Sequence, residues 1–105
     1  MTVSLLKLKS LIFSSPRQEG YLQLIINDNL QDGSKYGIIE NVFVKKECRK
    51  KGIATQLIKD AVNYAKENNL YKIILNCSDQ NIDLYHKNGF KVYQYNMRHF
   101  LKNLQ

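Results

Sequence analysis

The chain has 105 residues, a formal net charge of +7 and 44% hydrophobic residues. This length suits one domain, residues 1–105, because half of the chain would bury too little apolar surface to fold alone. It contains no run of the ~18 apolar residues that a membrane span needs, and its two cysteines, Cys48 and Cys77, lack the spacing of a disulfide framework or a zinc site. We therefore expect a soluble cytoplasmic protein with reduced thiols, no membrane association and no bound metal.

The positive charge is concentrated in one segment. Five of the seven residues from Lys45 to Lys51 are basic, whereas the cations of the C-terminal third are spread singly. Such a cluster favours an anionic partner, and by charge alone a nucleic acid, an acidic membrane or a phosphorylated small molecule would each fit. Because no nucleic-acid-binding motif accompanies the charge, we expect no nucleic-acid partner.

The first half of the chain has the pattern of an antiparallel hairpin followed by a longer strand. Residues 4–13 and 21–27 are rich in leucine and isoleucine, and the SPRQEG between them carries the proline and glycine of a turn. After a turn-rich connection, residues 38–44 are apolar on both faces except at Glu40 and Asn41. That pattern is typical of a central strand covered on both sides.

A helical period begins after Gly52. Small and apolar residues recur at three- and four-residue spacings over residues 54–65, with polar residues on the opposite face. A second strand of the buried type follows at residues 71–77. Strand, helix and strand in this order predict a right-handed crossover between parallel strands.

The C-terminal part predicts one more helix and one more strand. A short helix over residues 81–88 ends at Gly89, a residue suited to the position after a helix, and residues 90–100 have the composition of a final strand. The expected architecture is therefore a mixed, twisted α/β sheet with an antiparallel N-terminal hairpin.

The start of the long helix is a candidate anion site. A helix that begins directly after a strand presents unpaired N–H groups and the positive end of its dipole. Gly52 permits close approach of a ligand, and Ala54 keeps the next inward position small. A charged loop whose glycine merely permits a turn would have the same pattern, so both alternatives stay open. The stretch lacks G-x-x-x-x-G-K-[ST], which disfavours ATP or GTP.

Three segments together resemble one family. ENVFVKKECRKKGIATQLI, YKIILNC and N-x-x-x-Y-x-K-x-G-F occur in an order and spacing similar to those of the GNAT superfamily of acetyl-CoA-dependent N-acetyltransferases. Within it, residues 37–102 look most like the glucosamine-6-phosphate N-acetyltransferases. The resemblance implies the GNAT fold, acetyl-CoA as co-substrate and direct transfer of acetyl to a primary amine in a ternary complex, with glucosamine 6-phosphate as the leading acceptor.

The resemblance also implies which residues bind acetyl-CoA. The R-x-x-G-x-A loop would hold the pyrophosphate through backbone N–H groups, the end of the preceding strand and Asn81 would contact the pantetheine arm, and Lys87 would reach the phosphates. The residues implied to bind acetyl-CoA are Phe43, Val44, Arg49, Lys50, Lys51, Gly52, Ile53, Ala54, Thr55, Asn81 and Lys87.

Two residues are implied for catalysis. Tyr85 matches the family tyrosine that protonates the departing thiolate, and a phenol, with a pKa near ~10, can give up its proton late in the reaction. Glu40 is the one acid on a strand that otherwise looks buried, which suits a base acting directly or through water; an exposed edge position or a structural ion pair is the alternative. An acetyl-cysteine intermediate on Cys77 is the less favoured alternative, because no histidine lies nearby in the sequence to activate the thiol.

The expected acceptor site includes Glu40 but departs from the glucosamine-phosphate enzymes at two positions. Those enzymes carry acids where this chain has Asn41 and Asn76, and an amide can orient an amine but cannot take its proton at neutral pH. Another small amine or a protein lysine therefore remains an alternative acceptor, and a non-catalytic acyl-CoA-binding domain is a further alternative.

The resemblance extends to phosphate binding and to assembly. Lys72 and Arg98, or the neighbouring His99, match positions near the sugar phosphate. The family has a strand and two helices before the hairpin that form one wall of the acceptor pocket, whereas this sequence begins almost at the hairpin. In those enzymes the last strand builds an intertwined dimer, so we expect a homodimer through residues 90–100 whose partner supplies the missing wall.

Overall fold

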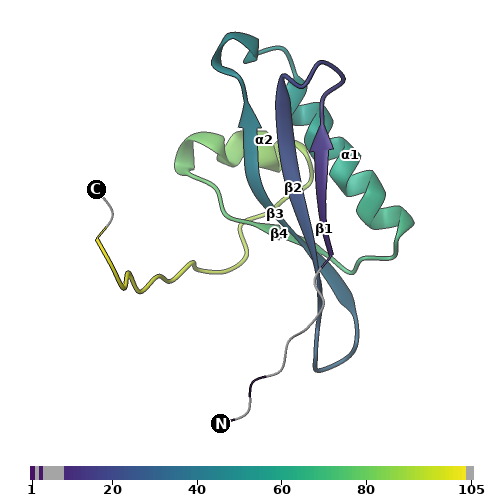
Figure 1. Cartoon of the computed structure of the whole chain (residues 1–105), viewed down its shortest axis with the longest axis vertical. Coiled ribbons are helices and arrows are strands. Elements are labelled where there is room, and N and C mark those ends of the chain that lie inside the picture. The colour runs from purple at the N-terminus through teal and green to yellow at the C-terminus, as the bar shows by residue number, and fades with distance from the viewer. Residues whose placement is uncertain (2, 4–8, 104–105) are drawn as a thin grey trace.

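The computed structural model describes residues 1, 3 and 9–103, which form one sheet and two helices (Figure 1). The sheet has four strands in the order β1-β2-β3-β4. In chain order the elements are β1 (Lys9–Ser14), β2 (Gly20–Asp28), β3 (Lys35–Val44), the 3-10 turn η1 (Lys46–Cys48), α1 (Ile53–Glu67), β4 (Ile73–Leu75), the 3-10 turn η2 (Asp79–Asn81) and α2 (Ile82–Lys87).

The pairing of the strands confirms the predicted mixed sheet. β1, β2 and β3 are antiparallel neighbours, and β4 lies parallel to β3 after the crossover through α1. The hairpin between β1 and β2 is closed by Ser15, whose Oγ accepts hydrogen bonds from the N–H groups of Glu19 and Gly20 at 2.8 and 3.1 Å. Residues 4–8 of the predicted first strand lie outside the described residues.

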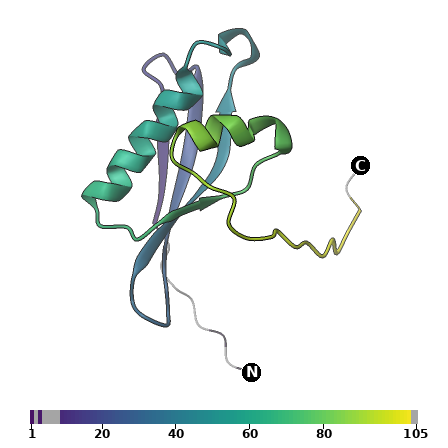
Figure 2. The same cartoon turned by 180° about the vertical axis from the view of Figure 1, so that it is seen from behind.

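Both helices pack on the same face of the sheet, which Figure 2 shows from the helix side. The buried core joins β2 and β3 to α1 and α2 through Leu22, Leu24, Ile39, Leu57, Ile58, Ala61 and Tyr85. Among the described residues the opposite face carries no helix, and Ile12, Tyr21 and Phe43 remain 61, 42 and 43% exposed there. Within the described residues, the expectation that β3 is covered on both faces is therefore wrong.

The long helix α1 begins where the sequence predicts. Gly52 is its N-cap with φ of 81°, a left-handed conformation that glycine adopts without steric cost. Its buried residues Leu57, Ile58, Ala61 and Ala65 follow the predicted spacing. The apolar stripe seats the helix on β2 and β3, and this seating fixes the first turn of the helix beside the end of β3.

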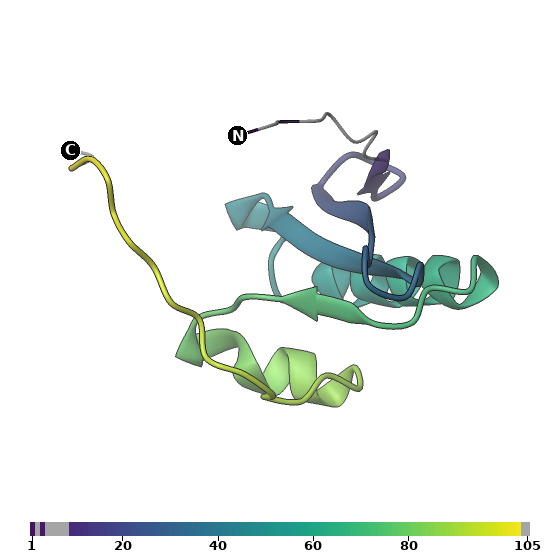
Figure 3. The same ribbon diagram turned by 90° about the horizontal axis from the view of Figure 1, so that it is seen from below.

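The predicted C-terminal strand is absent. α2 ends at Lys87 and Gly89 has φ of 91°, as expected for a residue that terminates a helix, but residues 91–103 pair with no strand that the structure describes. In Figure 3 this segment runs along the side of the molecule away from α1. The prediction failed because composition alone supplies no neighbour, and a strand is stable only when its backbone groups are paired. No described helix has the length and apolarity required to cross a bilayer.

Candidate active site

A cleft opens where β3 and β4 separate. Their pairing covers only Gly37–Ile39 and Ile73–Leu75, and beyond these residues the two chains diverge around a volume of about 270 Å³. The residues that line the cleft are Ile39, Glu40, Asn41, Val42, Leu75, Asn76, Cys77, Ser78, Asn81 and Tyr85. The cleft therefore brings together Glu40, Asn41, Asn76, Asn81 and Tyr85, which were predicted site residues separated in sequence.

A β-bulge shapes the β3 wall of this cleft. Tyr21 pairs with Phe43 and Gln23 pairs with Glu40, so β3 contains one residue more than β2 between these pairs. Asn41 occupies the bulge with φ of 55°. Because a bulge interrupts the alternation of side chains, the consecutive residues Glu40 and Asn41 both reach the cleft.

Tyr85 lines the cleft from α2 while its ring belongs to the core. The residue is 8% exposed and packs with the buried residues of β2, β3 and α1. Burial raises the pKa of Tyr85, and the nearby Cys77 thiol adds to the rise. The phenol therefore keeps its proton at neutral pH and can donate it to an anion in the cleft.

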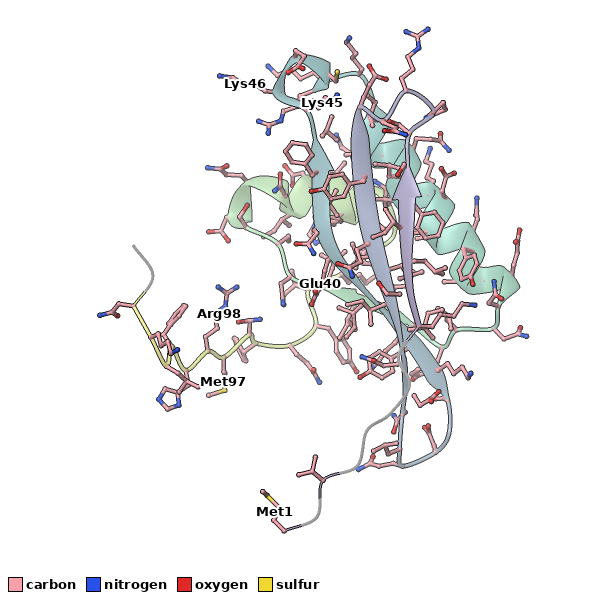
Figure 4. The ribbon with its side chains drawn as sticks, in the orientation of Figure 1. Met1, Glu40, Lys45, Lys46, Met97 and Arg98 are labelled. Carbon is pink, nitrogen blue, oxygen red and sulfur yellow. The ribbon has the colours of Figure 1, made fainter. Side chains whose placement is uncertain are left out.

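Glu40 differs from its expected surroundings. It lines the cleft from β3, but its side chain is exposed because the sheet face that carries it has no covering layer within the described residues (Figure 4). A carboxylate in contact with solvent can pass a proton to water directly, so exposure is compatible with a role as a base.

Cys77 was expected to be a buried residue of a strand, and this expectation is wrong. β4 ends at Leu75, so Cys77 lies after the strand, is exposed and lines the cleft beside Tyr85. Ser78, whose Oγ accepts a hydrogen bond from Asn81 Nδ2 at 3.3 Å, also lines the cleft, and the sequence did not single it out. The only signal for Ser78 was its place directly after the strand predicted at residues 71–77.

The predicted anion site lies at the end of the same strand β3. Lys50 and Gly52 both have left-handed backbones, with φ of 65° and 81°. None of the backbone N–H groups from Lys50 to Thr55 donates a hydrogen bond within the part of the chain that the structure describes, and no acidic residue stands in the first turn of α1. These free N–H groups, with no carboxylate in the first turn of the helix, fit a pyrophosphate. Figure 4 shows Lys45 and Lys46 beside this loop, which Arg49 Nε ties to Val44 O at 3.1 Å.

The cations predicted to bind phosphates outside the loop, Lys72, Lys87 and Arg98, do not line the cleft. Lys72 lies over the rings of Tyr36 and Tyr71 with its Nζ 5.6 and 5.8 Å from their centroids. Lys87 is exposed at the end of α2, and Arg98 is on the C-terminal segment, where its Nε donates to Asn96 Oδ1 at 3.0 Å. His99, the alternative to Arg98, is exposed on the same segment. No group of three metal-ligating side chains gathers in the described ranges.

The region that contains the cleft and the loop matches a known family. Residues 18–90 match the model of the acetyltransferase (GNAT) family. The chain belongs to this family. A Trypanosoma brucei acetyltransferase has the same fold, with a TM-score of 0.78 at 28% identity over 90% of this chain and 69% of that one.

Two curated relatives carry the same name. The chain is 36% identical over 62 residues to glucosamine 6-phosphate N-acetyltransferase of Candida albicans, covering 59% of this chain and 42% of that protein. It is 31% identical over 80 residues to glucosamine 6-phosphate N-acetyltransferase of Trypanosoma brucei brucei, covering 75% of this chain and 54% of that protein. The chain thus spans about half the length of these GNAT relatives.

Proposed function

We propose that this GNAT domain transfers the acetyl group of acetyl-CoA directly to a primary amine in a ternary complex. The observation that carries the proposal is the relation of two sites on one strand: the loop of unpaired N–H groups follows the end of β3, and the cleft that holds Tyr85 and Glu40 flanks the middle of β3. An extended donor lying along β3 reaches from one site to the other. Phe43 and Val44, between them, contribute the strand against which its pantetheine arm lies.

The acid in this reaction is Tyr85. Attack of the amine on the thioester carbonyl breaks the carbon–sulfur bond and leaves negative charge on sulfur. A phenol that burial keeps protonated donates a hydrogen bond to that sulfur and then its proton. Asn81, on the turn before α2, borders the same part of the cleft and orients the donor through its side-chain amide.

Glu40 takes the proton of the amine, either directly or through a water molecule. The exposed carboxylate meets solvent on the open sheet face, so the proton can leave to bulk water after each turnover. Asn41 and Asn76 hydrogen-bond the acceptor from the two walls of the cleft without taking its proton.

The leading acceptor is glucosamine 6-phosphate, since two relatives carry the name of enzymes for that sugar. Another small amine is the alternative, because Asn41 and Asn76 stand where the resemblance leads us to expect acids. Within this proposal Lys72 and Arg98 bind a phosphate of the acceptor after the C-terminal segment or a second copy has moved against the cleft, and Lys87 reaches the phosphates of the donor. The cytoplasm, where cysteines stay reduced, suits a chain with two unpaired cysteines.

We further propose that the domain is a homodimer through its C-terminal segment. Tyr93, Tyr95 and Met97 stand at every second position of this segment and are 90, 98 and 91% exposed. When such a segment pairs as a strand with a second copy, side chains at every second position lie on one face, and large apolar side chains gathered on a surface favour association. A second copy would cover these three residues.

Thiol release from acetyl-CoA with glucosamine 6-phosphate and a panel of primary amines tests the proposal. Turnover is expected in the unaltered chain and is expected to fall about 100-fold or more in Tyr85→Phe and in Glu40→Gln, as is usual for a lost general acid or base. Tyr71→Phe and Glu67→Gln remove matching groups from exposed positions and leave turnover unchanged. Stabilisation by CoA without turnover of any amine would instead support the acyl-CoA-binding alternative.

A further inference from the structure

A line of hydrogen-bonded side chains crosses the open face of the sheet. Asn41 Nδ2 on β3 donates to Gln23 Oε1 on β2 at 2.8 Å, and Gln23 Nε2 donates to Ser10 Oγ on β1 at 2.9 Å. Gln23 is partly buried, whereas the two end residues are exposed. The line therefore ties the bulge of β3 to two neighbouring strands.

The bulge residue is the one that needs such support. Asn41 has φ of 55°, and a left-handed backbone costs an L-residue about 1–2 kcal/mol, least for asparagine and aspartate, whose side chains bond locally. Its side chain bonds across the sheet instead, to the residue of β2 that pairs with Glu40. The contact consequently fixes the orientation of the side chain as well as the path of the backbone.

The direction of the hydrogen bonds leaves one acceptor free. An asparagine amide has an NH₂ group that donates and a carbonyl oxygen that accepts. In Asn41 the NH₂ group is engaged by Gln23, while Oδ1 has no hydrogen-bond partner among the residues that the structure describes. Because Asn41 lines the cleft, this oxygen is available to a donor there, such as an amine or a hydroxyl group.

We propose that Gln23 and Ser10 are positioning residues that turn the amide of Asn41 so that its carbonyl oxygen meets the acceptor amine or a hydroxyl group beside it. This inference rests on the proposed acetyltransferase function. Neither residue lines the cleft itself, so each acts on the acceptor through Asn41, the cleft residue that Gln23 holds. This arrangement acts on the acceptor and not on the phosphates of acetyl-CoA, since the loop that fits a pyrophosphate lies beyond Val44, the last residue of β3.

Steady-state kinetics with glucosamine 6-phosphate, or with the best amine of the panel, tests this role through substitutions of Gln23. Gln23→Leu keeps a similar volume but removes both hydrogen bonds, and is expected to raise the acceptor KM about five- to tenfold while kcat changes less than about threefold. The KM of acetyl-CoA stays unchanged. Gln23→Glu keeps an acceptor for Asn41 Nδ2 and is expected to restore the acceptor KM to within about twofold.

A matched substitution and a double variant separate positioning from general stability. Gln56→Leu removes a comparable surface bond, from Gln56 Nε2 to Asp60 Oδ1 at 2.8 Å on α1, and leaves the acceptor KM unchanged. Asn41→Gly accepts the left-handed backbone but lacks the amide, so it raises the acceptor KM as Gln23→Leu does, and the two changes together have no larger effect than Asn41→Gly alone.

If the unaltered chain turns over normally, either of two results would overturn this inference and leave the proposed function standing. One is an unchanged acceptor KM in Gln23→Leu. The other is an equal rise in the KM of acetyl-CoA and the acceptor in both Gln23→Leu and Gln23→Glu, which would mean that the sheet as a whole had loosened. Absence of turnover in the unaltered chain with every amine would overturn the proposed function, and this inference with it.

Discussion

The rings of Tyr85 and Phe90 pack edge to face, with centroids 5.9 Å apart and an interplanar angle of 77°. A backbone hydrogen bond joins the same two residues: after the chain turns at Gly89, Phe90 N–H donates to Tyr85 O at 3.0 Å. The chain that follows α2 therefore folds back over Tyr85, the proposed acid. The ring of Tyr85 is fixed in the core while the residue still borders the cleft.

This burial predicts how the stability of the domain depends on pH. The pKa of Tyr85 is raised by burial and by the nearby Cys77, so above about pH 10, the ordinary value for tyrosine, the folded state binds a proton that the unfolded chain has lost. The contribution of Tyr85 to stability is complete below its pKa in the unfolded chain and is lost as pH rises through its pKa in the folded state. The unaltered chain should therefore lose more stability than Tyr85→Phe between about pH 9 and pH 11.

Urea unfolding across this pH range measures the difference. Tyr71→Phe is the control, because Tyr71 is 75% exposed and its loss should leave the pH dependence as in the unaltered chain. Identical pH dependence in Tyr85→Phe and Tyr71→Phe would contradict the assignment of a buried, protonated phenol at position 85.

Substitutions at two glycines with similar backbones distinguish an effect on acetyl-CoA binding from an effect on the stability of the fold. Gly52 and Gly33 have φ of 81° and 75°, and an added Cβ would meet no atom within 4 Å at either position. Gly52→Ala and Gly33→Ala should therefore each cost about 1–2 kcal/mol of stability, through backbone strain alone. Only Gly52→Ala should weaken acetyl-CoA binding, by about tenfold, because strain at the helix start turns the N–H groups away from the pyrophosphate.

Isothermal titration with acetyl-CoA and thermal unfolding of both variants make this comparison. Equal losses of affinity in Gly52→Ala and Gly33→Ala would show that the loop is not where the donor phosphates bind.

Cys77 lies in the cleft but is not needed for direct transfer. Cys77→Ala should keep turnover within about threefold of the unaltered chain, because in a ternary complex the amine itself attacks the thioester. Turnover assays, together with mass spectrometry of the chain after incubation with acetyl-CoA alone, check this. A loss as large as that of Tyr85→Phe, accompanied by an acetyl group on Cys77, would establish a covalent intermediate instead.

The proposed dimer depends on one side of the C-terminal segment. Replacing both Tyr95 and Met97 with aspartate places charges among exposed apolar side chains and should convert a dimer into a monomer in sedimentation velocity. The matched pair Gln94→Asp and Asn96→Asp adds the same charges to the alternate positions and should leave the dimer intact. A monomeric unaltered chain at micromolar concentration would refute the proposal.

Several parts of the site were predictable because their signals are local. The apolar spacing of α1 and the glycine at its start predicted both the helix and its free N–H groups, since helical period and backbone freedom are properties of neighbouring residues. Tyr85 was predicted at a functional position on the basis of resemblance, and the structure brings it to the cleft with Glu40.

Other parts depended on what each segment meets in space. The sequence suggested that Glu40 was buried, Cys77 internal and residues 90–100 a strand, because apolar and β-branched runs indicate burial without showing whether a layer or a paired strand is present. The bulge at Asn41 had no local signal, since it arises from a mismatch of register between β2 and β3.

The sequence by itself determined the order of strands and helices as far as α2, the start of α1 at Gly52 and membership of a family, because these depend on periodicity and on short runs of residues. Only the tertiary structure decided that β3 and β4 diverge into a cleft, that one sheet face stays open, and that Gln23 and Ser10 hold the amide of Asn41. Those relations join residues far apart in the chain, and their geometry is set by strand register and packing that no local pattern encodes.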